Sequence, residues 1–318
     1  MEQTHESVLL NECLESLAIG PNDVVVDATI GGAGHFKALM ATLGAEGALI
    51  GIDADEDAIG RAALAVNAAA AGGPRVYLVH DNFRNLDAIL EHEGIETIDK
   101  ALFDLGWSSF HLTSGRGFSF RADEPLYMTY GSPEEGKTAA DLVNSATEEE
   151  LSDIIFTYGE ERFARGIARS IVQTRRNSPI LTTTELAEAV TRGTPGWYQH
   201  RRLHPATKTF QALRIAVNDE LGALRAGLTA ALARLSPGGR VAVITFHSIE
   251  DRIVKSMFRD AAYQGTGKLV NKKPLVPTTA EMARNPRSRS AKLRVFEHCN
   301  AGANTCPATF DHAALSLV

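Results

Sequence analysis

Short apolar runs alternate with helical segments through the first hundred residues, and this alternation restricts the fold more than any other feature. The apolar runs predict strands at 24–27, 48–53, 76–80 and 100–104. Helical patterns at 35–43 and 56–71 separate the first three of them. Such alternation is typical of βαβ units, in which helices cover a parallel sheet. We therefore expect an α/β protein with a sheet of mostly parallel strands.

The pattern changes between about residues 110 and 205, where strand signals become scarce and helical ones dominate. Helices are expected to start at Thr147 and at Thr183, because each Thr is followed within three residues by a Glu, a sequence typical of a helix N-terminus. We interpret this stretch as a helical insertion. The predicted division is a first part of an α/β domain at residues 1–110, an inserted helical domain at 111–206, and a second part of the α/β domain at 207–318.

The first pattern returns after the helical stretch. A long helix is expected over 209–235, followed by a Pro-Gly turn at 236–239 that stops the helix and leads into a strand at 241–246. This strand would be the fifth of the same sheet. The basic, turn-rich tail then contains one more predicted strand, at 292–296, which we expect at the edge of the sheet.

Composition indicates a globular chain. Hydrophobic residues make up 44% and charged residues 22% of the 318 residues, which argues against disordered, collagen-like and coiled-coil classes. No apolar run approaches the roughly 18 residues of a membrane helix, and the polar, acidic residues 1–6 lack the features of a signal peptide. We expect a cytoplasmic protein. Three cysteines cannot make a disulfide framework and are spaced too widely for a zinc knuckle, so we expect reduced thiols and no metal site.

The net charge of −7 does not indicate a nucleic-acid binder, but the local charge does. Five cations and no acid lie between Arg192 and Arg214, together with three aromatic residues. A second stretch, 268–297, has eight cations and two acids. These stretches could be ordinary solvated surfaces, yet missing acids and interleaved aromatic residues favour contact with RNA phosphates and bases. The candidate phosphate contacts are Arg201, Arg202 and Lys208.

A nucleoside-binding pattern follows the first two strands. The first strand ends in Asp27 and runs into a glycine-rich loop at 28–35 that leads into a helix, where backbone amides can approach a ligand. The second strand ends in Asp53, which could accept hydrogen bonds from a ribose diol. The alternative is a tight turn followed by a solvated acid. The pattern does not separate a dinucleotide from S-adenosylmethionine, although Lys37 stands where a dinucleotide fingerprint needs Gly or Ala.

A third acid, Asp104, ends the fourth predicted strand and precedes Gly106 and Trp107. Open α/β sheets place their ligands at this carboxyl edge. Asp104 is therefore a candidate catalytic residue, with three open roles: to hold the amine of a cofactor, to accept an N–H from a target amine, or to cap the next segment. Trp107 could stack on a flipped base or pack in the core.

Ten segments spread over the chain resemble the bacterial RsmH (MraW) family. Outside the glycine-rich loop they are specific to that family, and their order along the chain matches it. They are His5–Leu10, Gly34–His35, Asp81–Phe83, Asp104–Ser109, Arg116–Phe120, Tyr158–Phe163, His204–Ile215, Pro237–Arg240, Thr245–Lys255 and Asn285–Arg294.

The resemblance implies a Rossmann-like class I methyltransferase fold with an inserted all-helical domain that recognises the substrate. It also implies S-adenosylmethionine-dependent N4-methylation of a cytidine in the decoding (P-site) region of 16S small-subunit ribosomal RNA. The implied partner is that RNA, in the assembled ribosomal subunit rather than naked, and a homodimer stays open. The cofactor contacts implied by the resemblance are Ala33, Gly34, His35, Asp53, Phe83, Asp104 and His111.

Departures from the family pattern motivate other interpretations. His111 stands where the family has Gln, and Tyr127 and Thr129 replace an acid and a base. They motivate one alternative, a noncatalytic RNA-binding or ribosome assembly factor on a methyltransferase fold. An NAD-linked oxidoreductase would share the first loop and Asp53, although the chain has no evident acid for hydride transfer.

Two further charged segments could have a structural role instead of a functional one. The Glu160–Arg162 segment is expected to pair on a helix surface. The residues that follow the fifth predicted strand, His247 to Arg252, could contact the substrate or form an ion-pair network that orders the loop.

Overall fold

The computed structural model describes residues 6–69, 72–105, 114–134 and 136–299. By their contacts these residues form two compact units. The first unit lies within Met1–Asp53, Ile59–Gly106 and Ala226–Val318. The second lies within Ala54–Ala58 and Trp107–Arg225. Within the described ranges, each helix is too short or too polar to cross a bilayer.

The first unit is built on a seven-stranded sheet in the order β3-β2-β1-β4-β5-β7-β6. The first five strands pair in parallel, and β7 is antiparallel to both β5 and β6. This arrangement confirms the expected Rossmann-like class I methyltransferase fold. The strands are β1 (Val24–Asp27), β2 (Ala48–Asp53), β3 (Arg75–His80), β4 (Ile98–Asp104), β5 (Leu235–Thr245), β6 (Gly267–Leu269) and β7 (Lys292–His298).

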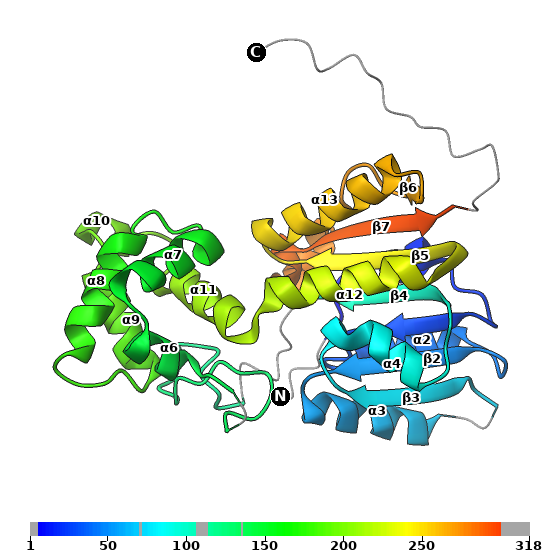
Figure 1. Cartoon of the computed structure of the whole chain (residues 1–318), viewed down its shortest axis with the longest axis horizontal. Coiled ribbons are helices and arrows are strands. Elements are labelled where there is room, and N and C mark those ends of the chain that lie inside the picture. Colours follow the sequence, from blue (N-terminus) through cyan, green and yellow to red (C-terminus); the bar gives the residue numbers. More distant parts are fainter. Residues whose placement is uncertain (1–5, 70–71, 106–113, 135, 300–318) are drawn as a thin grey trace, which may run out of the picture. The chain divides into compact units, whose positions relative to one another are not determined.

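Helices cover the sheet and bury its strands. Figure 1 shows α4 and α12 in front of the sheet, where Arg234 donates from Nε to Asp87 Oδ1 at 2.7 Å. The α1 helix packs on β4, β5 and β7. The central strands are almost wholly buried, which explains their continuous apolar runs. The helices are α1 (Leu10–Leu17), α2 (Gly34–Thr42), α3 (Glu56–Ala68), η1 (Phe83–Asn85), α4 (Leu86–His92), α12 (Glu220–Arg234), α13 (Ser248–Tyr263), α14 (Thr279–Arg284) and η2 (Pro286–Ser290).

The predicted long helix over 209–235 is wrong, because the chain breaks at Asp219. This residue adopts a left-handed conformation with φ 45° and ends the helix that precedes it. A Cβ on Gly222 would lie 2.4 Å from the Asp219 carboxylate, so this acid packs against the first turn of α12. Asp visits left-handed conformations more easily than most residues, since its short side chain bonds locally.

Two other predictions near the carboxyl end also differ from the structure. The expected turn at 236–239 is an irregularity inside β5, between the pairs Ile98–Leu235 and Lys100–Arg240. The strand β7 is not at the sheet edge, since β6 pairs with its outer side. With only three residues, β6 is too short to show a period in the sequence.

The second unit packs its helices around one apolar core. Leu151, Ile155, Ile167, Leu186 and Leu213 are among the fully buried members of this core. Three of the helices begin with a capping box, including the ones expected to start at Thr147 and Thr183. The helices are α6 (Ala139–Ser145), α7 (Glu148–Gly159), α8 (Ala164–Arg175), α9 (Thr183–Arg192), α10 (Gly196–Gln199) and α11 (Ala206–Asn218).

Candidate functional site

Three carboxylates lie at one edge of the sheet in the first unit. Asp27, Asp53 and Asp104 end β1, β2 and β4, which are neighbours and parallel. Their carboxyl ends therefore meet at the same edge, where open α/β sheets bind ligands. Asp27 is fully buried, whereas the other two acids are partly exposed. The edge thus combines one inaccessible and two accessible acids.

The loop between β1 and α2 is held close to this edge by its own backbone. Gly31 donates its N–H to Asp53 Oδ2 at 2.8 Å, and Ala33 donates its N–H to Ile30 O at 2.8 Å. Ala33 has φ 60° and directly precedes α2. The amides of Gly34 and His35 then lie in the first turn of α2, where N–H groups have no intrahelical acceptor. Such amides suit an anionic group of a ligand.

Gly34 is required by packing. A Cβ at this position would lie 2.0 Å from Ser7 Oγ, closer than side chains approach each other. The amino-terminal segment therefore passes directly against the first turn of α2. A residue with a Cβ would require the Ser7 side chain to rotate away, and its Cβ would still lie 3.3 Å from Ser7 Cβ.

The imidazole of His35 lies below the loop rather than at its surface. Its Nε2 is 3.1 Å from Val8 O, and its Nδ1 is 3.4 Å from Asp104 Oδ2. Burial alone would lower the pKa of His35, but hydrogen bonds to Asp104 and Cys13 outweigh burial and hold this pKa well above its ordinary value. The His35 side chain therefore contacts protein groups below the loop.

Asp104 and Asp27 are connected through Thr29. Asp104 donates its N–H to Thr29 Oγ1 at 2.7 Å, and Thr29 donates its N–H to Asp27 Oδ1 at 3.2 Å. Asp27 Oδ2 is buried with no hydrogen-bond partner among the described residues. Burial raises the pKa of Asp27 to about 7, against a lowering by His35. The Asp104 side chain keeps 20% of its surface exposed, so of this pair it is the acid that a ligand could reach.

Phe83 follows β3 and lies in η1 with its ring partly exposed. The ring packs edge-on against Phe103 with centroids 5.6 Å apart. A Cβ on Gly227 would lie 2.7 Å from Phe83 Cδ2, so the glycine in α12 makes room for this ring. Asn82 accepts the Arg84 N–H at 3.0 Å and caps the turn. His111 and Trp107, the other two aromatic candidates, lie outside the described residues.

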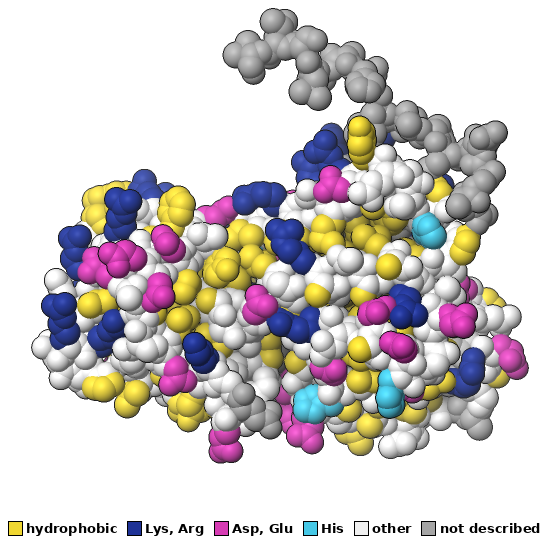
Figure 2. Space-filling view, in the orientation of Figure 1, with side chains coloured by type: hydrophobic (Ala, Val, Ile, Leu, Met, Phe, Trp, Pro, Cys, Tyr) yellow, Lys and Arg dark blue, Asp and Glu magenta, His cyan; other side chains and the backbone are white. Residues whose placement is uncertain are grey.

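The candidate RNA contacts of the second unit differ in exposure: Arg201 and Arg202 are exposed, whereas Lys208 is half-buried. Lys208 donates from Nζ to Glu160 O at 2.7 Å, and the Arg201 guanidinium lies over the Tyr198 ring at 5.4 Å. Arg202 is exposed at the same turn. Around α10, Figure 2 shows cationic and hydrophobic side chains next to one another. Arg201 is thus placed beside an aromatic ring, but Tyr198 is only 6% exposed and packs inside the unit.

An aromatic cluster in this unit surrounds Arg162 and was not predicted from the sequence. The Arg162 guanidinium lies 4.7 Å from the Phe163 ring centroid and 4.8 Å from that of Trp197. The predicted surface pairing of the Glu160–Arg162 segment is wrong for Glu161, which is fully buried and accepts from the Tyr198 hydroxyl at 2.6 Å. The one sequence signal that could have indicated this cluster is the set of aromatic residues interleaved with the cations near Arg201. The Trp197 side chain is 57% exposed.

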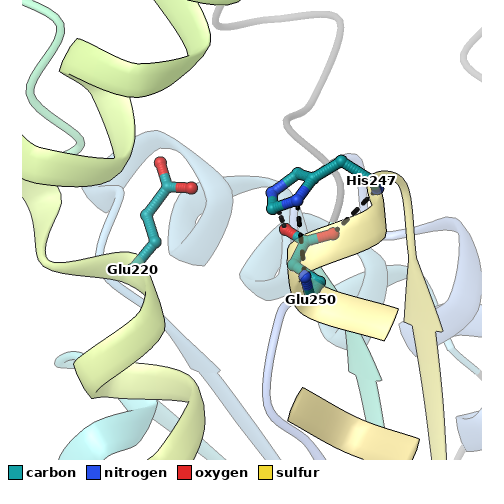
Figure 3. A group of neighbouring side chains, drawn as sticks. All are labelled: Glu220, His247 and Glu250. Carbon is teal, nitrogen blue, oxygen red and sulfur yellow. Dashed lines mark hydrogen bonds and ion pairs between the residues drawn. The ribbon is translucent and has the colours of Figure 1, made fainter. Parts of the chain in front are cut away.

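The charged residues after β5 form a network that orders the loop. His247 and Glu250 make a capping box at the start of α13, and their side chains approach to 3.0 Å (Figure 3). Asp251 accepts from Arg294 Nε at 2.6 Å and from Lys292 Nζ at 3.1 Å. Burial raises the pKa of Asp251, but these two cations outweigh it and lower the pKa. The geometry of the described residues favours the structural alternative.

Glu220, which Figure 3 also draws, belongs to the second unit. Within that unit it accepts from Arg214 Nε at 2.7 Å and from the Tyr130 hydroxyl at 2.9 Å. Its carboxylate therefore ties the start of α12 to α11 and to the segment before α6.

Comparisons with known proteins add an independent finding. The model of the MraW methylase family matches residues 2–299. A protein of Paenibacillus sp. named ribosomal RNA small subunit methyltransferase H is 47% identical over 315 residues, covering 92% of this chain and 98% of the relative. One of the same name from Deinococcus deserti is 48% identical, covering 92% and 93%. Among solved structures, an rRNA methylase from Streptococcus thermophilus is 14% identical with TM-score 0.42, covering 92% of this chain and 94% of that one.

Proposed function

Because this chain belongs to the MraW methylase family, we propose that it transfers a methyl group from S-adenosylmethionine to N4 of a cytidine in the decoding (P-site) region of 16S small-subunit ribosomal RNA. The observation that carries this proposal is the 47% identity, over nearly the whole length of both chains, to a relative named ribosomal RNA small subunit methyltransferase H. The acids and the glycine-rich loop at the sheet edge support the cofactor.

We assign the cofactor contacts by chemistry. The amides of Gly34 and His35, in the first turn of α2, suit the methionine carboxylate. Asp53 suits the ribose diol, and Phe83 provides a ring against the adenine. Asp104 suits the ammonium group, since its carboxylate is partly exposed.

Two further cofactor assignments depend on position in the chain. The N–H of Ala33 is engaged by Ile30 O, so we assign Ala33 the shaping of the loop at φ 60°. His111 is proposed as a further contact and lies outside the described residues.

Fit to S-adenosylmethionine is supported by the packing of the loop. Gly34 adds no side chain at the first turn of α2, where the loop lies close to Ser7. When bound, S-adenosylmethionine supplies a methyl group whose bond to the positive sulfur breaks as the bond to N4 forms. The protein must bring a weak nucleophile in line with that methyl group, because the N4 lone pair is conjugated into the cytosine ring. The residues of the edge therefore act chiefly by positioning.

The acid nearest this chemistry is Asp104, our candidate catalytic residue. If it holds the ammonium group, its removal lowers cofactor affinity. If Asp104 instead accepts a hydrogen bond from the N4–H of cytosine, its removal lowers the rate of methyl transfer at saturating cofactor. No covalent intermediate with the protein is needed in either case.

The RNA would bind through cations and aromatic rings. We propose that Arg201, Arg202 and Lys208 contact phosphates, and that Trp107 stacks on a base near the target cytidine. Each lost phosphate contact should reduce the salt dependence of binding by about one unit of slope or slightly less. We further propose that the substrate is the assembled small subunit and that the protein acts in the cytoplasm. A homodimer stays open, and gel filtration of the purified protein will test it.

The direct test incubates the purified protein with labelled S-adenosylmethionine and small ribosomal subunits that lack the modification. Nucleoside mass spectrometry should then detect N4-methylcytidine, and Asp104→Ala should abolish or strongly reduce it. Parallel reactions with naked 16S RNA separate the two substrate forms.

A negative result separates the alternatives. Cofactor binding without product on competent subunits would favour the noncatalytic RNA-binding factor, the alternative motivated by the departures at Tyr127, Thr129 and His111. Binding of NAD in place of S-adenosylmethionine would favour the oxidoreductase.

A further inference from the structure

The ring of His35 joins two segments that are far apart in the sequence. One ring nitrogen faces a backbone carbonyl, Val8 O, and the other faces a carboxylate, Asp104 Oδ2. A carbonyl and a carboxylate are both acceptors, and the imidazolium form carries hydrogen on both nitrogens and can donate to both. The His35 side chain is 5% exposed, so water cannot replace either contact at little cost.

The carbonyl that orients the ring is itself held in place. Leu9, the next residue after Val8, donates its N–H to Glu281 Oε1 at 2.9 Å in a buried contact. The residue before Val8, Ser7, packs directly against the position of Gly34. Asn285 donates from Nδ2 to Glu6 O at 3.0 Å. The amino-terminal segment is therefore anchored by the α14 region, and it presents Val8 O to the ring at a defined place.

The titratable groups around His35 leave Asp104 as its counter-ion. Cys13 faces the ring from α1, Asp27 from β1 and Asp104 from β4. Burial raises the pKa of the Cys13 thiol, which keeps it neutral at physiological pH. Burial likewise raises the pKa of Asp27 to about 7. Asp104 is the partly exposed one of the three, and it is in direct contact with Nδ1.

We propose that His35 is a positioning residue, whose side chain holds the Asp104 carboxylate in the orientation that binds the ammonium group of the cofactor. The inference rests on the proposed function, because it takes S-adenosylmethionine as the ligand of this edge. It changes the role expected for His35: its amide contacts the ligand, while its side chain acts through Asp104. The amino-terminal segment thereby becomes part of the cofactor site without touching the cofactor.

The test compares two ligands that differ in the amino-acid part. S-adenosylhomocysteine carries the ammonium group, and 5′-methylthioadenosine lacks it. In calorimetric titrations of the full chain, His35→Gln should weaken S-adenosylhomocysteine roughly tenfold, the size of a typical coupling between contacting groups. Binding of 5′-methylthioadenosine should stay unchanged. Lys37→Gln, an exposed change one half-turn further along α2, is the matched control and should alter neither ligand.

A double-variant cycle tests whether His35 acts through Asp104. Asp104→Asn should show the same ligand selectivity, and the combined variant His35→Gln with Asp104→Asn should bind S-adenosylhomocysteine no more weakly than Asp104→Asn alone. His35→Asn, whose shorter amide can donate toward Asp104, should restore part of the lost affinity. It also provides the test if His35→Gln fails to fold by circular dichroism.

Three results would overturn the inference. Equal weakening of both ligands in His35→Gln would mean that the ring only supports the loop. Additive losses in the combined variant would mean that His35 acts independently of Asp104. Failure of the unaltered protein to bind S-adenosylhomocysteine would instead overturn the proposed function, and the inference with it.

Discussion

Replacing Asp27 by Asn should make the stability of the first unit less sensitive to pH. Asp27 is 0% exposed, and its Oδ2 has no hydrogen-bond partner in the described part of the chain. Ionisation of Asp27 therefore places a charge in a buried site where only one carboxylate oxygen, Oδ1, accepts a hydrogen bond, from the N–H of Thr29. The amide of Asn cannot ionise and can still accept that N–H. The substitution removes the charge while it preserves the shape of the side chain.

The size of the effect follows from linkage. Burial raises the pKa of Asp27 from 3.8 to about 7, and a pKa difference of that size corresponds to about 4 kcal/mol. The folded protein holds the proton more tightly than the unfolded chain. This contribution to the free energy of unfolding is therefore fully present below about pH 4, declines as the pH rises towards 7, and is lost above it.

Urea unfolding followed by circular dichroism between pH 4.5 and 8.5 measures this difference. The free energy of unfolding of Asp27→Asn minus that of the unaltered protein should increase with pH by about 3 to 4 kcal/mol and then level off above pH 8. Glu91→Gln, a change on the exposed face of α4, controls for the loss of one carboxylate. A difference that stays constant within about 1 kcal/mol would refute the reasoning.

Three further outcomes test the packing. Gly227→Ala should weaken S-adenosylhomocysteine binding about tenfold, because the new Cβ would lie 2.7 Å from Phe83 Cδ2. Calorimetric titration measures this loss, and Gly60→Ala is the control, because a Cβ at that position meets nothing within 4 Å. In urea unfolding, Gly60→Ala should raise the free energy of unfolding by up to about 1 kcal/mol, since Ala favours the helix. Tyr198→Phe should lower it by about 1 to 3 kcal/mol, because buried Glu161 loses a hydroxyl donor; an unchanged urea midpoint would contradict that role.

The order of the elements in the first unit was predictable because burial on both faces produces continuous apolar runs. The predicted strands at 24–27 and 48–53 coincide with β1 and β2. Parallel pairing then required that the acids ending β1, β2 and β4 share one edge. The capping box at Thr147 was predictable as well, since its side chains act within one turn.

Other features depended on partners that no local pattern indicates. Glu161 follows the end of α7, so its sequence context resembles a solvated acid, yet its partner Tyr198 lies 37 residues further along the chain. The three-residue β6 is too short for a periodic signal, and its pairing with β7 depends on the sheet already formed. The break at Asp219 depends on a single left-handed residue inside an otherwise helical pattern.

Residue order alone was enough to predict the class of the fold, the edge where the acids gather and the family to which the chain belongs. Those features follow from periodicity and from the positions of motifs along the chain. The pKa shifts of the site depend instead on tertiary contacts. Burial raises the pKa of Asp27, whereas hydrogen bonds to Asp104 and Cys13 outweigh burial and raise the pKa of His35. Desolvation and pairing are properties of a packed environment, so residue type and spacing do not reveal them.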